Sequence, residues 1–259
     1  MESANSPRVR PIIYGHRGAR GHAPENTLLA FALAFDLGAD AIECDVQRSS
    51  DDQLVIIHDE TINRTTDGRG KVRETPFETL RALNAGVRWN TPQCIPTLAE
   101  TLALVEARGG AMNLEVKADS RDDALATAAV VEGTLAELDE PLRARLMVSS
   151  FELAAVEWLT ARLPWLRVGA LFTGSQWRKD DMVARALDLG VEALHANLSL
   201  VTPDLVERAQ SAGLRVNVWT ANRWATIRKL LTLGVDGIFS DVPERVVIER
   251  ARFAARETS

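Results

Sequence analysis

The feature that most limits the fold of this chain is a regular alternation of strand-like and helix-like runs. Short apolar runs recur roughly every 20 to 40 residues, and a run with helical periodicity follows almost every one of them. This alternation is typical of parallel βα units. The predicted strands are Pro11–Gly15, Ala41–Val46, Met112–Val116, Leu146–Ser150, Val168–Phe172, Ala193–Asn197, Arg215–Trp219 and Gly237–Ser240. Eight parallel strands close a TIM barrel, so the sequence predicts an α/β fold of the (β/α)8 class.

The segments between the predicted strands carry the start and stop signals of helices. Thr97 is followed three residues later by Glu100, which is the pattern of a capping box. Gly190, Gly213 and Gly234 each end a helical run shortly before a strand. The predicted helices are Asn26–Leu37, Thr97–Ala107, Arg121–Leu138, Glu152–Arg162, Lys179–Leu189, Pro203–Ala212, Arg223–Leu233 and Pro243–Ala254, with a short helical piece near Phe77–Leu83.

The alternation is interrupted once, after the predicted strand Ala41–Val46. A polar stretch too short for a crossover helix leads to a second apolar run, Leu54–Ile57, and this spacing predicts a β-hairpin. A turn centred near residues 50 and 51 would place Glu43 opposite His58. Residues 59–95 are polar and rich in Gly, Thr and Arg, so we expect a small insertion after the second strand, lying over the barrel mouth.

Composition narrows the class of protein further. A net charge of −6 argues against nucleic acid as a partner. No apolar run reaches the ~18 residues of a transmembrane helix, and the N-terminus lacks a signal-peptide run, so we expect a cytoplasmic protein. Cys44 and Cys94 are too few for a disulfide framework, and Cys44 is predicted to face away from the site. We expect residues 1–9 to form a loose tail, and a chain of 259 residues, close to the ~250 of one barrel, to form one domain over 1–259.

Three acidic residues are the candidate metal ligands. Glu43 and Asp45 lie two positions apart on a predicted strand, so both point to the same face. Glu115 shares a face with Lys117 on the next barrel strand. Active sites of such barrels lie at the C-terminal ends of the strands, so these side chains should meet on one rim. Carboxylates are hard oxygen ligands, which predicts a divalent cation, Mg²⁺ or Ca²⁺, rather than zinc.

Two histidines and two basic residues end on the same predicted rim. If the substrate is a phosphodiester, His16 and His58 can act as general base and general acid near neutral pH. Arg17 can bind two phosphate oxygens, and Lys117 adds a compact positive charge. His22 and His195 have no partner that the sequence reveals, and we expect structural roles for both.

Each of these residues also has a plain structural interpretation. His16 could be a strand-end histidine tied to the backbone, Arg17 could form an ordinary salt bridge, and Trp219 could belong to the core. Glu115 and Lys117 could simply neutralise each other. The functional hypothesis depends on the joint pattern, because independent structural roles would not be expected to fall on one rim.

Several runs of the sequence, read together, also match a known family. The runs are Gly15-His16-Arg17-Gly18, Pro24-Glu25-Asn26-Thr27, Ile42-Glu43-Cys44-Asp45-Val46, His58-Asp59, Arg64-Thr65-Thr66, Asn113-Leu114-Glu115-Val116-Lys117 and Val218-Trp219-Thr220. With these runs the chain resembles the glycerophosphodiester phosphodiesterases from about Ile12 to Pro243. In one departure from the family pattern, the turn Ser49–Asp52 lacks the usual glycine.

The resemblance implies a TIM barrel with a small insertion and a divalent cation. It implies that His16 and His58 are the acid/base pair, that Glu43, Asp45 and Glu115 hold the metal, that Arg17 and Lys117 contact phosphate, and that Trp219 lies near the glycerol. The implied reaction is hydrolysis of a small glycerophosphodiester, such as glycerophosphocholine or glycerophosphoethanolamine, to an alcohol and sn-glycerol 3-phosphate.

Two alternative functions stay open at this stage. One is a lysophospholipase D, with an acyl chain along the few apolar residues of the insertion, and the other is a catalytically silent barrel that binds metal or phosphate. The sequence leaves open the cation, the headgroup, the oligomeric state, the division of roles between the histidines, and whether water or a glycerol hydroxyl attacks first.

Overall fold

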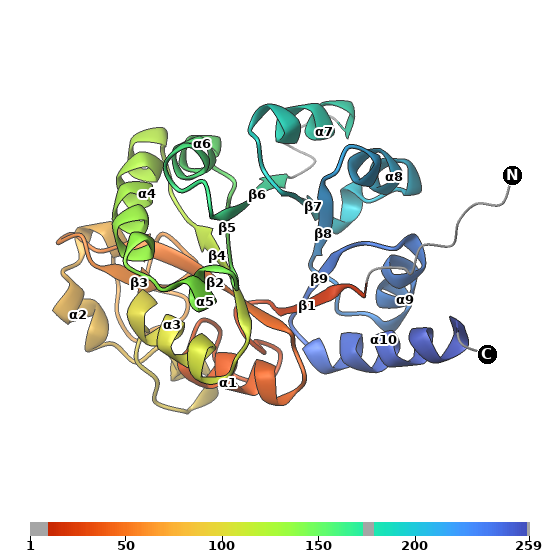
Figure 1. Cartoon of the computed structure of the whole chain (residues 1–259). Helices are drawn as coiled ribbons and strands as arrows, with labels where there is room; N and C mark the ends of the chain where they lie inside the picture. The colour runs from red at the N-terminus through yellow and green to blue at the C-terminus, as the bar shows by residue number, and fades with distance from the viewer. Residues whose placement is uncertain (1–9, 173–178, 258–259) are drawn as a thin grey trace, which may run out of the picture.

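Eight parallel strands close into a barrel in the computed structural model, which describes residues 10–172 and 179–257 (Figure 1). The barrel strands are β1 (Ile12–Gly15), β2 (Ala41–Arg48), β4 (Ala111–Val116), β5 (Leu146–Ser150), β6 (Arg167–Phe172), β7 (Ala193–Asn197), β8 (Arg215–Trp219) and β9 (Gly237–Ser240). β1 pairs with both β9 and β2, which closes the ring. The prediction of a (β/α)8 barrel is confirmed. The loose tail predicted for residues 1–9 lies outside the described residues.

Helices surround the strands on the outside of the barrel, except for the short helix of the insertion, α2 (Figure 1). The helices are α1 (Leu28–Asp36), α2 (Phe77–Arg81), α3 (Leu98–Ala107), α4 (Arg121–Ala136), α5 (Glu140–Arg143), α6 (Leu153–Arg162), α7 (Lys179–Asp188), α8 (Pro203–Ser211), α9 (Trp224–Leu233) and α10 (Pro243–Glu257), with 3₁₀ turns η1 (Val72–Glu74), η2 (Val87–Trp89) and η3 (Leu198–Leu200). The predicted capping box is present, because Thr97 and Glu100 each accept a hydrogen bond from the other's backbone N–H.

One predicted helix ends earlier than expected. The predicted helix Arg121–Leu138 stops at Ala136, and the separate helix α5 begins soon after. The Asp139 side chain accepts a hydrogen bond from the backbone N–H of Leu142, which starts a new helix in place of a longer old one.

The strands present two different faces. Their outward side chains, such as Ile42, Leu114 and Val148, pack against the helices in the main hydrophobic core, and Cys44 lies among them as predicted. Inside the barrel, Tyr14 and Phe239 stack with ring centroids 4.4 Å apart and form an apolar floor. Polar side chains occupy the interior above that floor, toward the C-terminal ends of the strands.

The hairpin after β2 is present, but its predicted register was wrong by one residue. β3 (Leu54–Ile56) returns antiparallel to β2, with Val46 opposite Ile56, so Glu43 is not in register with His58. The backbone N–H of Ser49 donates to the oxygen of Gln53, which leaves a loop of residues 50–52. Asp52 takes the left-handed conformation, with φ of 60°. It therefore adopts the backbone conformation that a glycine usually provides in this turn.

The insertion, residues 59–95, packs against this hairpin through a small core of its own. Ile62, Val72, Leu80 and Ile95 are buried there with Val55 of β3. The insertion therefore covers the face of β3 that carries Val55, whereas Leu54 and Ile56 on the other face belong to the main core.

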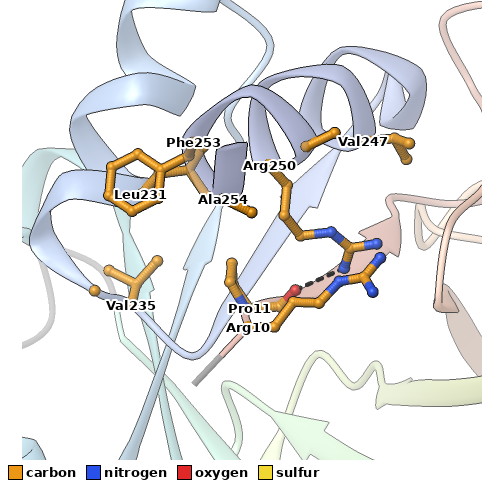
Figure 2. Close-up of a pocket in the computed structure, with 10 residues that line it drawn as sticks. Arg10, Pro11, Leu231, Val235, Val247, Arg250, Phe253 and Ala254 are labelled. Atoms are coloured by element: carbon orange, nitrogen blue, oxygen red, sulfur yellow. Dashed lines mark hydrogen bonds between the residues drawn. The ribbon is translucent and has the colours of Figure 1, made fainter. Parts of the chain in front are cut away.

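A cavity of about 320 Å³ lies at the opposite, N-terminal end of the barrel (Figure 2). Pro11 and Val235, which line it, precede β1 and β9, and Phe253 of α10 forms another wall. Arg250 at its edge donates to the backbone oxygen of Pro11 and pairs with Asp40. The described lining holds no carboxylate and no histidine, so this larger cavity is not where acid/base groups collect. None of the described helices is long and apolar enough to cross a membrane.

Candidate active site

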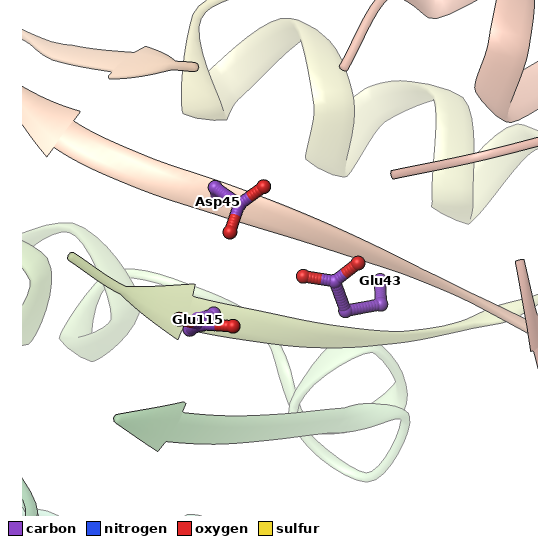
Figure 3. Close-up of side chains that lie close together, drawn as sticks. All are labelled: Glu43, Asp45 and Glu115. Atoms are coloured by element: carbon purple, nitrogen blue, oxygen red, sulfur yellow. The ribbon is translucent and has the colours of Figure 1, made fainter. Parts of the chain in front are cut away.

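Three carboxylates from the neighbouring strands β2 and β4 lie close together (Figure 3). Glu43 and Asp45 come from β2, and Glu115 of β4 stands in register with Asp45. One oxygen of each carboxylate lies within 4.8 Å of the others, and all three residues are buried. Strand alternation therefore brings the three acids together, as the sequence predicted.

This acidic cluster fits a hard divalent cation. Burial, together with the charges of Asp45 and Glu115, raises the pKa of Glu43 well above its usual value. Burial also raises the pKa of Glu115. The buried atoms Glu43 Oε1 and Asp45 Oδ1 have no hydrogen-bond partner among the described residues. Oxygens without donors, held among like charges, are the ligands that Mg²⁺ and Ca²⁺ prefer.

Arg17 stands on one side of this cluster. Its backbone is left-handed, with φ of 52°, which is uncommon for a residue with a side chain, and its N–H donates to Glu43 Oε2 at 2.7 Å. Its Nη1 lies 2.9 Å from Glu25 Oε1, and its Nε lies 3.4 Å from Asp45 Oδ2. Arg17 thus stays beside the acids through both its backbone and its side chain.

Lys117 stands on the other side. Its Nζ lies 2.7 Å from Glu115 Oε1 and 3.8 Å from Asp45 Oδ1. Burial opposes the ionisation of Asp45, but the charges of Arg17 and Lys117 outweigh it and hold the pKa of Asp45 below its usual range. The pair of Glu115 with Lys117 exists, but Nζ is also 3.2 Å from His58 Nε2, so the lysine does more than neutralise one acid.

The two histidines flank the cluster, and an aspartate holds each of them. His16 Nδ1 lies 2.7 Å from Asp241 Oδ1, and His58 Nδ1 lies 2.7 Å from Asp59 Oδ1. An ionised carboxylate only accepts hydrogen bonds, so we assign the proton to Nδ1 in both rings. In the neutral ring Nε2 then carries no proton. His16 Nε2 lies 4.0 Å from Glu43 Oε2, and burial lowers the pKa of both histidines.

His58 reaches the site because the chain leaves the hairpin ladder before it. β3 ends at Ile56, and the Gln47 side-chain amide donates to the backbone oxygens of Ile57 and Asp59 at 2.9 and 2.7 Å. This amide holds the residues on both sides of His58, so the imidazole reaches the acids although the register differs from the predicted one.

The predicted residues surround one small pocket of about 50 Å³. The lining residues are His16, Arg17, Glu43, His58, Asn113, Glu115, Lys117, Phe151, Leu171, His195, Trp219 and Phe239. Asp45 lies behind this lining, where its Oδ2 accepts a hydrogen bond from Asn26. Trp219 and Phe151 form an aromatic wall, with ring centroids 5.5 Å apart and an edge-to-face geometry.

The structure adds polar residues that the sequence did not single out. The sequence revealed no partner for His195; in the structure its Nε2 lies 3.0 Å from the amide nitrogen of Asn217, and burial lowers its pKa to about 3. The amide of Asn113 donates to Ser149 inside the barrel. The sequence signal that could have identified these residues is the presence of polar residues at alternate positions of strands that are otherwise apolar. His22, as expected, lies outside the site and pairs with Glu244 at the surface.

The barrel fold, with its pocket lined by acids and histidines toward the C-terminal ends of the strands, is that of a TIM-barrel enzyme. The model of the glycerophosphoryl diester phosphodiesterase family matches residues 16–245, so the chain belongs to this family, and its activity is that of a glycerophosphodiester phosphodiesterase. A glycerophosphodiester phosphodiesterase from Caldanaerobacter subterraneus subsp. tengcongensis is 32% identical over 92% of this chain and 97% of its own. Another from Bacillus altitudinis is 33% identical over 91% of this chain and 96% of its own.

Solved structures agree with this assignment. A phosphodiesterase from Oleispira antarctica, in complex with the product sn-glycerol-3-phosphate, gives a TM-score of 0.84 at 32% identity, over 92% of this chain and 96% of that one. A glycerophosphodiester phosphodiesterase from Agrobacterium tumefaciens gives a TM-score of 0.75 at 28% identity, over 91% of this chain and 98% of that one.

Proposed function

We propose that the chain hydrolyses small glycerophosphodiesters, such as glycerophosphocholine and glycerophosphoethanolamine, to an alcohol and sn-glycerol 3-phosphate. The observation that carries this proposal is the placement of two aspartate-bound imidazoles on either side of three buried carboxylates. The product complex of the Oleispira antarctica enzyme supports the same product here. The proposed domain is the whole chain, 1–259, with residues 59–95 as an insertion.

In this proposal Glu43, Asp45 and Glu115 hold a divalent cation, Mg²⁺ or Ca²⁺. When bound, such a cation neutralises a phosphoryl oxygen and orients or activates an oxygen nucleophile. The carboxylate oxygens without hydrogen-bond donors are what support the ligand assignment.

The proton transfers fall to His16 and His58. Each ring is oriented through Nδ1, so its Nε2 is the atom that takes a proton from the nucleophile or gives one to the leaving alcohol. Burial lowers the pKa of both rings, which favours the neutral form that can accept a proton. The ring that acts as acid first takes up a proton and is stabilised by its aspartate.

Binding of the substrate falls to the remaining lining residues. Arg17 and Lys117 bring positive charge from opposite sides of the acids, where they can contact the phosphate. Trp219, with Phe151, offers an aromatic wall for the glycerol or the leaving group. The pocket of about 50 Å³ has no room to enclose an acyl chain, which favours a deacylated substrate over a monoacylated one.

A second candidate, a lysophospholipase D, is favoured by one observation. Val87 and Trp89 are exposed apolar residues on the insertion, where they could contact an acyl chain. Rates on glycerophosphocholine and on its monoacylated counterpart, measured at equal concentration, separate the two functions. We expect the deacylated substrate to be turned over faster.

The main test replaces each proposed acid/base residue. His16→Ala and His58→Ala are expected to abolish release of sn-glycerol 3-phosphate while the protein stays folded. His22→Ala is the matched control, because it removes a surface histidine that also pairs with a carboxylate. A wild-type rate in either of the first two variants would refute the assigned role.

A further inference from the structure

We propose that Arg64 is a positioning residue that holds the acid/base arm and the phosphate arm of the site in one fixed arrangement. This inference rests on the proposed function of His58 and Arg17. Arg64 belongs to the insertion and does not line the pocket, so it acts through the residues that it binds.

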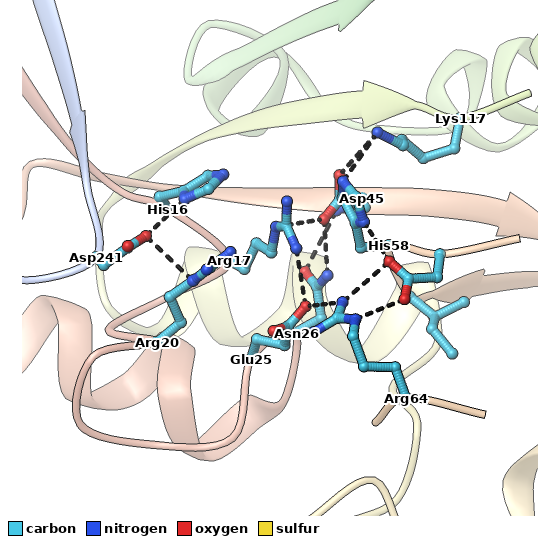
Figure 4. Close-up of polar contacts among 12 residues, drawn as sticks. His16, Arg17, Arg20, Glu25, Asn26, Asp45, His58, Arg64, Lys117 and Asp241 are labelled. Carbon is cyan, nitrogen blue, oxygen red and sulfur yellow. Dashed lines mark hydrogen bonds and ion pairs between the residues drawn. The ribbon is translucent and has the colours of Figure 1, made fainter. Parts of the chain in front are cut away.

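The guanidinium of Arg64 binds two carboxylates, each with two hydrogen bonds (Figure 4). Toward Asp59, its Nε lies 2.5 Å from Oδ2 and its Nη2 lies 3.0 Å from Oδ1. Toward Glu25, its Nη1 lies 2.8 Å from Oε2 and its Nη2 lies 2.7 Å from Oε1. A planar fork with donors on two edges fits this double bidentate arrangement, and the single ammonium of a lysine does not.

Each of the two carboxylates holds one arm of the site. Asp59 Oδ1 lies 2.7 Å from His58 Nδ1, which orients the imidazole. Glu25 Oε1 lies 2.9 Å from Arg17 Nη1. An unbroken series of hydrogen bonds therefore runs from His58 through Asp59, Arg64 and Glu25 to Arg17 (Figure 4).

The electrostatics of the network agree with this role. Hydrogen bonds from Arg64 lower the pKa of Asp59 to about 2. Burial opposes the ionisation of Glu25, but hydrogen bonds from Arg64 and Arg17 outweigh it and lower its pKa to about 2. Arg64 thus stabilises the charged form of both carboxylates, in which each accepts a hydrogen bond from its partner.

Arg64 itself lies apart from the metal ligands, and the network reaches them only at its far end, where Arg17 Nε lies 3.4 Å from Asp45 Oδ2. Arg64 makes none of its described contacts with Glu43, Asp45 or Glu115. Loss of Arg64 should therefore disturb His58 and Arg17 while the affinity for the cation stays the same.

The test compares Arg64→Ala and Arg64→Lys with a matched control, Arg81→Ala. Arg81 also lies in the insertion and also forms a double contact with one carboxylate, Glu100, at 2.9 and 2.7 Å, but far along the chain from the site residues. We expect Arg64→Ala to lower kcat about 10- to 100-fold, the usual range for partners that orient a functional ligand. It should also raise KM, because Arg17 loses its support. Arg64→Lys should recover part of kcat, and Arg81→Ala should match the wild type in both parameters.

Replacing each of the two carboxylates singly should separate the effect on kcat from the effect on KM. Asp59→Asn should act mainly on kcat through His58, and Glu25→Gln mainly on KM through Arg17, whereas Arg64→Ala should act on both. A purely structural role would instead lower Tm without this division. The cation concentration for half-maximal activity should stay within twofold of the wild type in all these variants.

The proposal is overturned if Arg64→Ala keeps kcat and KM within twofold of the wild type. It is also overturned if Arg81→Ala lowers kcat as much as Arg64→Ala does. It is also overturned if the loss is explained by a fall in Tm alone. His58→Ala, assayed alongside, separates this outcome from failure of the proposed function. An inactive His58→Ala with an unaffected Arg64→Ala refutes only the positioning role, while an active His58→Ala refutes the acid/base assignment itself.

Discussion

Asp241 Oδ1 lies 2.7 Å from His16 Nδ1, although the two residues are 225 positions apart in the sequence. The contact exists because β1 pairs with β9 where the barrel closes, so the ends of the first and last strands are neighbours. Asn222 donates to the other oxygen of this carboxylate at 2.7 Å, and Arg20 Nε lies 3.2 Å from Oδ1. The aspartate is therefore held in place before it orients the imidazole.

Asp241→Asn is expected to lower kcat by about 10²-fold or more, because an amide can present its NH₂ to Nδ1 and favour the wrong tautomer of His16. Steady-state kinetics with glycerophosphocholine measures the effect. Glu244→Gln is the control, since it alters the carboxylate that pairs with the surface histidine, His22. Equal kinetics in Asp241→Asn and the wild type would show that His16 needs no such partner.

Removal of divalent cations is expected to abolish activity and to lower Tm. Without a cation, the buried acids repel one another, as the raised pKa of Glu43 indicates. Returning Mg²⁺ or Ca²⁺ at about 100 times its Kd should stabilise the fold by about 2.7 kcal/mol, a rise in Tm of roughly 5 to 10 °C. Scanning calorimetry after chelation measures the shift.

Glu43→Gln should reduce that cation-dependent rise in Tm and increase the cation concentration needed for activity. Asp204→Asn serves as control, because it removes a surface carboxylate that pairs with Arg208 3.0 Å away. If Glu43→Gln responds to the cation as the wild type does, Glu43 is not a ligand.

Much of the fold could be predicted because its signals are local. Strands buried on both faces appear as short apolar runs, and glycine stops such as Gly234, with φ of 72°, mark helix ends. The register of the β2–β3 hairpin could not be predicted in this way. It depends on Asp52 adopting a left-handed backbone, and many turn residues compete for that conformation.

The residues of the site likewise divide into those that local sequence patterns predict and those that they do not. Glu43, Asp45 and Glu115 could be predicted to meet because strand alternation and parallel pairing decide which face each one occupies. The partners of His16 and His195 could not. Asp241 depends on barrel closure, and the amide of Asn217 meets His195 only across neighbouring strands.

Gln47→Leu is expected to lower kcat about 10- to 100-fold, because it removes the amide that holds the backbone on both sides of His58. It should also reduce the free energy of unfolding by about 1 to 3 kcal/mol, since it leaves carbonyl groups without donors. Kinetics and urea unfolding measure the two effects. Gln53→Leu in the same hairpin is the control, because its side chain is exposed and makes one long contact, 3.4 Å, with Asp51. Equal losses in both variants would argue against a specific role for Gln47.

Glu25 predicts how stability changes with pH. Its pKa falls from 4.5 to about 2 on folding, because hydrogen bonds from Arg64 and Arg17 outweigh the effect of burial. A carboxylate with a lowered folded pKa contributes stability above its unfolded pKa, and that contribution is lost as the pH falls through the folded value. At 1.36 kcal/mol per pKa unit, the full contribution of Glu25 to the free energy of unfolding is on the order of 3 kcal/mol. This contribution should be lost between about pH 4.5 and pH 2.

Glu25→Gln should therefore unfold more easily than the wild type at pH 7, and the difference between the two should shrink toward zero near pH 2. Urea unfolding at a series of pH values measures this difference directly. Glu157→Gln should show no such convergence, because Glu157 forms an exposed pair with Arg185, and such pairs contribute little. A constant difference between Glu25→Gln and the wild type from pH 7 to pH 2 would mean that the charge of Glu25 is not what stabilises this network.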